Sequence, residues 1–171
     1  IIGVYFLWNG KVMAAYEKQD KPIYSEELVK YAESGDAVAQ CDLGVCYANG
    51  SGIAKDSYEA FKWFKLSAEQ GYARGMRELG TCYVEGLGVE KNEEEGIKLY
   101  KLSAEKGNED AMYYLGACFY NGDGVSQDYG EAVKWWKKAA EKGYEIAMYN
   151  LGICFYNGDG VSQDYGEAVK W

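Results

Sequence analysis

Cysteines are the first side chains in this sequence whose chemistry and spacing need an explanation. Four of them recur at intervals of 36 residues, and a fifth lies five residues before the first: Cys41, Cys46, Cys82, Cys118 and Cys154. A row this long cannot converge on one tetrahedral zinc ion, whose Zn–S bonds are about 2.3 Å. We interpret the cysteines as small apolar groups packed in a core, and we expect no metal and no cofactor.

Acidic residues in a repeated pair are the second candidate chemistry, because two carboxylates can catalyse glycoside hydrolysis. An Asp or Asn precedes a Glu by three residues in every interval: Asp56/Glu59, Asn92/Glu95, Asp128/Glu131 and Asp164/Glu167. A catalytic pair is normally single, whereas this spacing is that of a capping box at a helix start, with Asp or Asn in place of Ser or Thr. A carboxylate-based hydrolase is therefore the disfavoured alternative, and we predict that the protein is not an enzyme.

Other catalytic and modification motifs also have simpler explanations. The chain contains no histidine, which excludes Ser-His-Asp and Cys-His nucleophile systems. Ser103 and Lys106 match the Ser-x-x-Lys motif of penicillin-recognising enzymes, but the next interval has Ala139 in place of the serine. Asn49 begins a glycosylation sequon whose Asn-Gly pair recurs in later intervals without the serine.

The charge balance narrows the class of partner. The 18 basic and 27 acidic residues give a net charge of −9. This argues against nucleic acids and anionic membrane surfaces, which attract basic proteins. No apolar run approaches the roughly 18 residues that span a bilayer, so we predict no membrane insertion. An acidic surface favours a basic protein or peptide as partner.

The elements that carry these residues follow from a 36-residue repeat. Its marker is a Leu-Gly pair, at Leu43-Gly44, Leu79-Gly80, Leu115-Gly116 and Leu151-Gly152. Each unit is predicted to contain a helix A of about 14 residues, a Gly-x-Gly loop, a helix B of about 15 residues and a tight glycine turn. The glycine of Leu-Gly would let helix B approach closely. Neither helix can bury its apolar face alone, so stacked units predict an α-solenoid.

The repeat divides the chain into consecutive segments. We predict a degenerate N-terminal segment 1–19, a partial repeat 20–35 with only helix B (Pro22 to Ser34, capped by Asp20), three repeats at 36–71, 72–107 and 108–143, and a truncated repeat 144–171. The apolar opening fits either a degenerate first helix or the remnant of a signal peptide. Residues 118–135 are identical to 154–171. Because the chain lacks an initiator Met and stops inside an expected helix, we expect a fragment of a longer protein.

The pattern Leu-Gly-x-Cys-Tyr/Phe-x-x-Gly-x-Gly-Ile/Val, followed by Asp or Asn and a second helix, resembles the Sel1-like repeat family over about residues 20–171. The resemblance implies an all-α fold, a right-handed αα superhelical solenoid related to tetratricopeptide repeats. It also implies a non-enzymatic scaffold or adaptor for protein complexes, with helix A on the concave side.

One branch of the family bridges two cysteines per repeat. This chain has one at the helix A position, and equivalent positions about 8–10 Å apart are too distant for a disulfide. We expect free thiols, which favour a reducing compartment and leave secretion open.

A candidate binding surface lies on helix A, where a stripe at positions i, i+3, i+7 and i+10 changes in every repeat. It places two arginines at one end and tyrosines at the other: Arg74, Arg77, Tyr113, Tyr120, Tyr149 and Tyr156. Tyr and Arg are frequent anchors of protein interfaces. We predict a groove for a protein or peptide. The alternatives are that the tyrosines bind a carbohydrate or small ligand, or that they pack against the neighbouring helix A.

Overall fold

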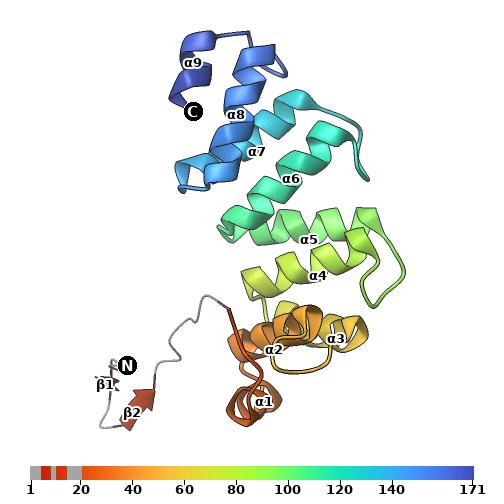
Figure 1. The fold of residues 1–171 in the computed structure, drawn as a ribbon, viewed down its shortest axis with the longest axis vertical. Coiled ribbons are helices and arrows are strands. Elements are labelled where there is room, and N and C mark those ends of the chain that lie inside the picture. The colour runs from red at the N-terminus through yellow and green to blue at the C-terminus, as the bar shows by residue number, and fades with distance from the viewer. Residues whose placement is uncertain (1–4, 9–10, 15–20) are drawn as a thin grey trace.

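The protein is a stack of paired helices. The computed structural model describes residues 5–8, 11–14 and 21–171, and the column climbs from α1 to α9 (Figure 1). Its helices are α1 (Glu26–Glu33), α2 (Ala37–Asn49), α3 (Ser57–Glu69), α4 (Ala73–Glu85), α5 (Glu93–Glu105), α6 (Glu109–Asn121), α7 (Tyr129–Glu141), α8 (Glu145–Asn157) and α9 (Tyr165–Lys170). Helix A of the successive repeats is α2, α4, α6 and α8, and helix B is α3, α5, α7 and α9. The predicted all-α solenoid is confirmed.

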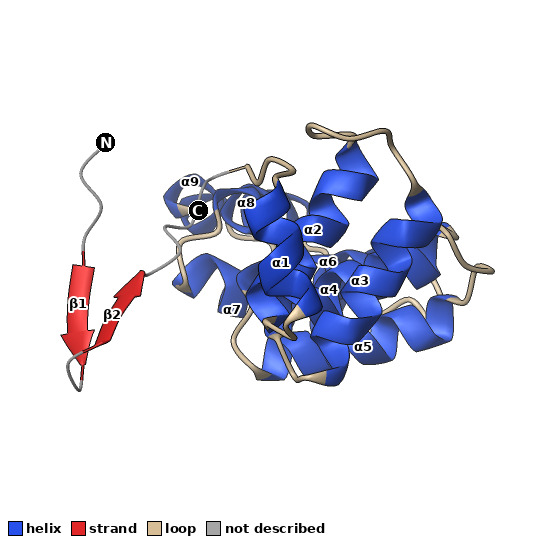
Figure 2. Ribbon diagram, turned by 90° about the horizontal axis from the view of Figure 1, so that it is seen from below, coloured by secondary structure: helices blue, strands red, loops and turns tan. Residues whose placement is uncertain are grey.

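A short hairpin precedes the solenoid. Its strands β1 (Tyr5–Trp8) and β2 (Lys11–Ala14) are antiparallel, with Leu7 opposite Val12, and are drawn red in Figure 2. The first strand occupies part of the segment for which a degenerate helix was one interpretation, so that interpretation is wrong. The signal-peptide alternative stays a prediction. The expected cap at Asp20 lies outside the described residues.

Helix α1 starts later than the sequence predicts. It begins at Glu26 instead of Pro22, because the Ser25 hydroxyl accepts a hydrogen bond from the backbone N–H of Leu28 at 3.1 Å. Just before this cap, the backbone N–H of Tyr24 donates to the carbonyl of Ser51 at 3.0 Å. The segment that was expected to be the first turn of the helix therefore pairs with the loop after α2.

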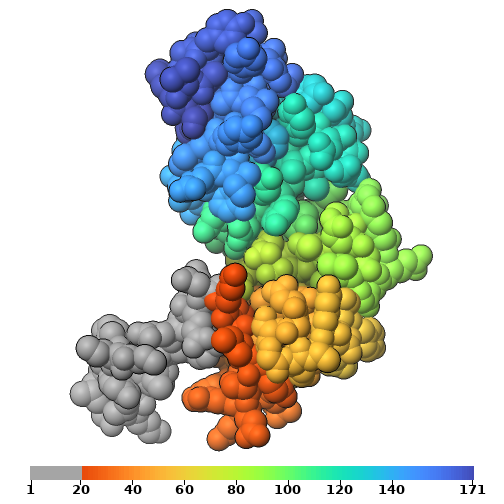
Figure 3. Space-filling view, viewed as in Figure 1, coloured from red at the N-terminus to blue at the C-terminus, as the bar shows by residue number. Residues whose placement is uncertain are grey.

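The core repeats with the sequence. The leucines of the Leu-Gly pairs and the cysteines three residues later are all buried. A Cβ on Gly116 would lie 2.5 Å from Cδ1 of Trp136, which confirms that helix B packs directly on this glycine. The aromatic after each cysteine, such as Tyr47, is only half-buried. Figure 3 shows the repeats as consecutive bands along the long axis.

The start of each helix B forms only half of the predicted capping box. Oδ1 of Asp128 accepts the backbone N–H of Glu131 at 2.9 Å, as the pattern requires. The backbone N–H of Asp128, however, donates to the carbonyl of Phe119 at 2.8 Å, while the Glu131 carboxylate pairs with Lys134. The cap therefore also fastens the loop to the preceding helix A. The other three repeats make the same backbone bond.

The second glycine of each loop joins consecutive repeats. Gly88 has φ +71°, and a Cβ there would lie 2.1 Å from the carbonyl oxygen of Ser57, at the start of the preceding helix B. Gly160 lies against Tyr129 in the same way. Only glycine combines this left-handed backbone with so close an approach.

Candidate functional site

We call the variable stripe of helix A the helix A face, although its member Cys41 is buried. It comprises Val38, Cys41, Val45 and Ala48 of α2, Arg74, Arg77, Thr81 and Val84 of α4, Asp110, Tyr113, Ala117 and Tyr120 of α6, and Ile146, Tyr149, Ile153 and Tyr156 of α8. Side chains on this face join one A helix to the next, as the following contacts show. All six residues predicted to bind a partner belong to it.

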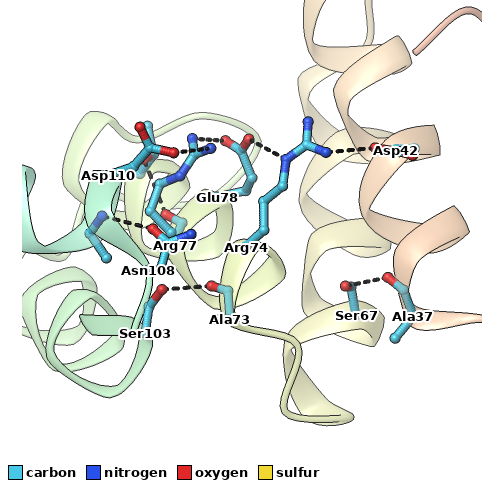
Figure 4. Close-up of polar contacts among 12 residues, drawn as sticks. Ala37, Asp42, Ser67, Ala73, Arg74, Arg77, Glu78, Ser103, Asn108 and Asp110 are labelled. Atoms are coloured by element: carbon cyan, nitrogen blue, oxygen red, sulfur yellow. Dashed lines mark hydrogen bonds and ion pairs between the residues drawn. The ribbon is translucent and has the colours of Figure 1, made fainter. Parts of the chain in front are cut away.

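The arginine end of the helix A face is an ion-pair chain (Figure 4). Nη1 of Arg74 lies 2.8 Å from Oδ1 of Asp42, which joins α4 to α2. Nη1 of Arg77 lies 2.8 Å from Oε2 of Glu78, and its Nη2 lies 3.6 Å from Oδ2 of Asp110 on α6. Both predicted anchors therefore already hold neighbouring repeats together, and a partner would have to compete with these pairs.

The charged groups of this ion-pair chain are partly or largely buried, which affects their pKa values and the cost of removing one of them. Burial raises the pKa of Glu78, and the nearby Arg77 and Arg74 act in the opposite direction. The Arg77 side chain is 14% exposed, and its Nε is buried without a hydrogen-bond partner among the described residues. Removing one member of such a group would leave a buried charge without its partner, which is a large cost. The arginine end is thus first of all a structural contact.

The tyrosine end divides into a packed pair and an open pair. Tyr120 donates its hydroxyl to Oδ2 of Asp159 at 3.0 Å, and burial is the main cause that raises the pKa of Tyr120 to about 12. Tyr113 is half-buried among other tyrosine rings. Tyr149 and Tyr156, by contrast, are 69% and 61% exposed. The first pair packs within the stack, since Tyr120 contacts the rings of Tyr129 and Trp136 on α7 and Tyr113 contacts that of Tyr144 at the start of α8. The second pair lies on α8, the last helix A that the structure describes.

Two hollows adjoin these tyrosines. The inner pocket lies between α6 and α8 above Trp136 and has a volume of about 240 Å³; it is lined by Tyr113, Ala117, Tyr120, Asn121, Trp136, Asn150, Ile153 and Cys154. The outer hollow, of about 470 Å³, contains Tyr149 and Tyr156. Asn121, Trp136 and Asn150 were not predicted from the sequence. The available signal was Asn150, which stands where the preceding repeat has Tyr114.

Side chains that suggested catalysis have structural contacts. The Ser103 hydroxyl of the apparent Ser-x-x-Lys motif donates to the carbonyl of Ala73 at 2.6 Å, and Ser67 does the same to Ala37 (Figure 4). These bonds tie helix B to the first turn of helix A. Within residues 21–171, no three Cys, Asp or Glu side chains are grouped as metal ligands. No helix in that range combines the length and apolar character needed to cross a membrane.

The predicted burial of the cysteines is confirmed, and all five are free thiols.

We expect thiol reagents at about pH 8 to react only when a repeat opens, because burial raises the pKa of Cys118 to about 11 and that of Cys41 to about 12. These thiols ordinarily titrate near 9.0. Their contribution to stability is therefore complete below about pH 9 and is lost as the pH rises toward 11. The rate at which the cysteine thiols react with a colorimetric disulfide reagent, measured with and without denaturant, checks this prediction. Immediate reaction of the native protein would contradict it.

Comparison with known proteins gives a consistent result. The Sel1 repeat profile matches residues 37–72, 73–108, 109–144 and 146–171. The chain resembles the structure of c5321, a protective antigen of uropathogenic Escherichia coli with an SLR fold, at 40% identity and TM-score 0.80 over 85% of this chain and 31% of that one. A Sel1 repeat protein of Oxalobacter formigenes is 32% identical with TM-score 0.75, over 85% and 66% of the two chains. Cysteine rich protein B of Helicobacter pylori is 28% identical with TM-score 0.57, over 71% and 92%. No curated protein gave a significant match.

Proposed function

The chain belongs to the Sel1 repeat family, and on that premise we propose that it is a scaffold or adaptor whose helix A face binds a protein or peptide partner. Sel1 repeats commonly mediate protein–protein interaction. The chain covers 31% and 66% of the first two similar structures. Any statement about the partner of the whole protein is therefore a proposal. In this proposal the helix A face is the concave side of the solenoid.

The observation that carries the proposal is the set of tyrosines on a face that varies between repeats, with Tyr113 and Tyr120 on α6 and Tyr149 and Tyr156 on α8. Tyr149 is 69% exposed and Tyr156 is 61% exposed, beside the half-exposed Ile146 and the outer hollow. Large aromatic rings with a polar tip contribute strongly to interfaces because they bury much area for few rotatable bonds. An array can keep its core and still change its partner, since these side chains are not needed to bury the leucines.

Charge supports a basic partner. The net charge of −9 attracts basic proteins and speeds their association at low salt. The two arginines on the helix A face do not oppose this, because each is paired with at least one carboxylate. We expect the association rate to fall as salt is raised, while the aromatic contacts set most of the dissociation rate.

Tyr149→Ala is the direct test. A photo-crosslinking residue at position 149 of the protein would first identify the partner, whose affinity is then measured in purified form. We expect Tyr149→Ala to weaken binding by about 2 kcal/mol, or roughly 30-fold, as a central aromatic anchor does. The melting temperature should change little, because the ring is mostly exposed.

Tyr58→Ala is the matched control, because Tyr58 is 59% exposed on α3, a helix B. We expect it to leave the affinity unchanged. Equal losses in the two variants, or none in Tyr149→Ala, would refute binding by the helix A face.

A further inference from the structure

The spaces between consecutive A helices differ in what fills them. Between α4 and α6, the ring of Tyr114 stacks on Tyr100 of the intervening helix B, with ring centres 5.5 Å apart and planes inclined by 16°. One repeat later, Asn150 takes the position of Tyr114, and Trp136 takes that of Tyr100. The inner pocket of about 240 Å³ opens at this point. The pocket therefore lies where the preceding repeat supplies an aromatic ring from its own sequence.

We propose that the inner pocket binds an aromatic side chain of the partner, stacked on Trp136 as Tyr114 stacks on Tyr100. This inference rests on the proposed function and specifies what the partner must present. Tyr120, which stands where the preceding repeat has Val84, already lies against Trp136 with ring centres 5.2 Å apart and planes inclined by 35°. The ring of the partner would occupy the space left beside these two residues.

The size and rigidity of the pocket suit this occupant. Its volume of about 240 Å³ exceeds the roughly 150 Å³ of an apolar cavity that takes up benzene. The indole N–H of Trp136 donates to the carbonyl of Tyr113 at 3.1 Å, and Tyr120 is fixed by its bond to Asp159. The walls are thus held in place before any ligand arrives, which reduces the entropic cost of binding.

The polar groups of the pocket favour a neutral ring with a hydrogen-bonding neighbour. None of the eight lining side chains is charged. Asn121 uses its amide nitrogen to contact Asp123 at 3.1 Å. Asn150 is half-buried at the pocket, and its amide offers both a donor and an acceptor. Such an amide matches the backbone beside an aromatic residue of a peptide, or the hydroxyl of a tyrosine.

The test follows the indole N–H signal of Trp136 by NMR in the ¹⁵N-labelled protein. The probes are N-acetyltyrosinamide and N-acetylphenylalaninamide, with N-acetylleucinamide and N-acetylglucosamine as an apolar and a saccharide comparison. We expect a saturable shift of this signal with the aromatic amides and not with the other two. An equal response to leucine amide, or a response to the sugar alone, would overturn the inference.

Asn150→Tyr is the decisive variant, because it restores the residue of the preceding repeat and should fill the pocket from within. We expect at least about tenfold weaker binding of the aromatic amides, with an unchanged or higher melting temperature. Asn150→Ala keeps the pocket open and removes only the amide, so it should weaken binding of the aromatic amides less than Asn150→Tyr does. Ala117→Ile, which introduces the residue found at the same position one repeat later, narrows the pocket independently and should also weaken binding. Binding by Asn150→Tyr as strong as that of the unmodified protein would overturn the inference.

The two proposals fail differently. Tyr149 does not line the inner pocket, so Tyr149→Ala should bind the aromatic amides normally. If Tyr149→Ala loses the partner while no aromatic amide shifts the Trp136 signal, the pocket inference is wrong and the helix A face still binds. If the amides bind but neither Tyr149→Ala nor Asn150→Tyr weakens partner binding, the proposed function is wrong.

Discussion

Leu115→Ala is expected to destabilise the protein by about 2–5 kcal/mol, the usual cost of truncating a fully buried leucine. Leu115 is 1% exposed and packs with Ile97, Tyr100 and Cys118 between α5 and α6. The substitution removes apolar contacts on both sides of a repeat boundary and leaves a cavity that the surrounding helices cannot close. Denaturant unfolding followed by circular dichroism measures the loss.

The control for this prediction is Leu102→Ala on α5, because Leu102 is 47% exposed. It should change stability by no more than about 0.5 kcal/mol. Hydrogen exchange should locate the effect of Leu115→Ala in α5, α6 and α7, since each repeat contacts only its neighbours. Equal acceleration of exchange in α2 and α3 would show that the array unfolds as one unit instead.

Gly88→Ala is expected to cost at least about 3 kcal/mol, more than a left-handed backbone alone explains. An alanine at φ +71° costs about 1–2 kcal/mol. The added methyl group would also lie 2.1 Å from the carbonyl oxygen of Ser57, so the loop would have to move away from α3 and lose its packing there.

Gly143→Ala separates these two costs. Gly143 has φ +92°, but no heavy atom lies within 4 Å of its virtual Cβ. Its substitution should cost only the backbone amount. Thermal unfolding of both variants gives the difference, and equal losses would mean that the contact between loop and helix contributes little to the stack.

Features that every repeat shares could be predicted from the sequence. The Leu-Gly pairs, the helix starts and the glycine turns follow from a period of 36 residues, because identical patterns must satisfy identical contacts. The start of α1 could not, since Pro22 belongs to a segment that pairs with another loop. The closing bond of each cap could not either, because its acceptor lies nine residues back on helix A, as at Asp128 and Phe119.

The candidate site depends on differences between repeats, which a period does not describe. The stripe could be selected from the sequence as a candidate face, but only the structure pairs Arg74 with Asp42 and Arg77 with Asp110 across repeat boundaries. Likewise, Asn150 is an ordinary polar residue in the sequence. It becomes notable because it lines the same pocket as Trp136, whereas the preceding repeat has Tyr114 at this position, stacked on Tyr100.

The identity of residues 118–135 and 154–171 bears on how such an array can be inherited. Deleting residues 118–153 would join Ala117 to Cys154 and leave a junction that reads as the unaltered sequence. That deletion removes Asn150, whereas the reciprocal duplication supplies it twice. Unequal crossing-over in this part of the gene would therefore change the number of repeats in whole steps, without creating a junction that is new to the sequence.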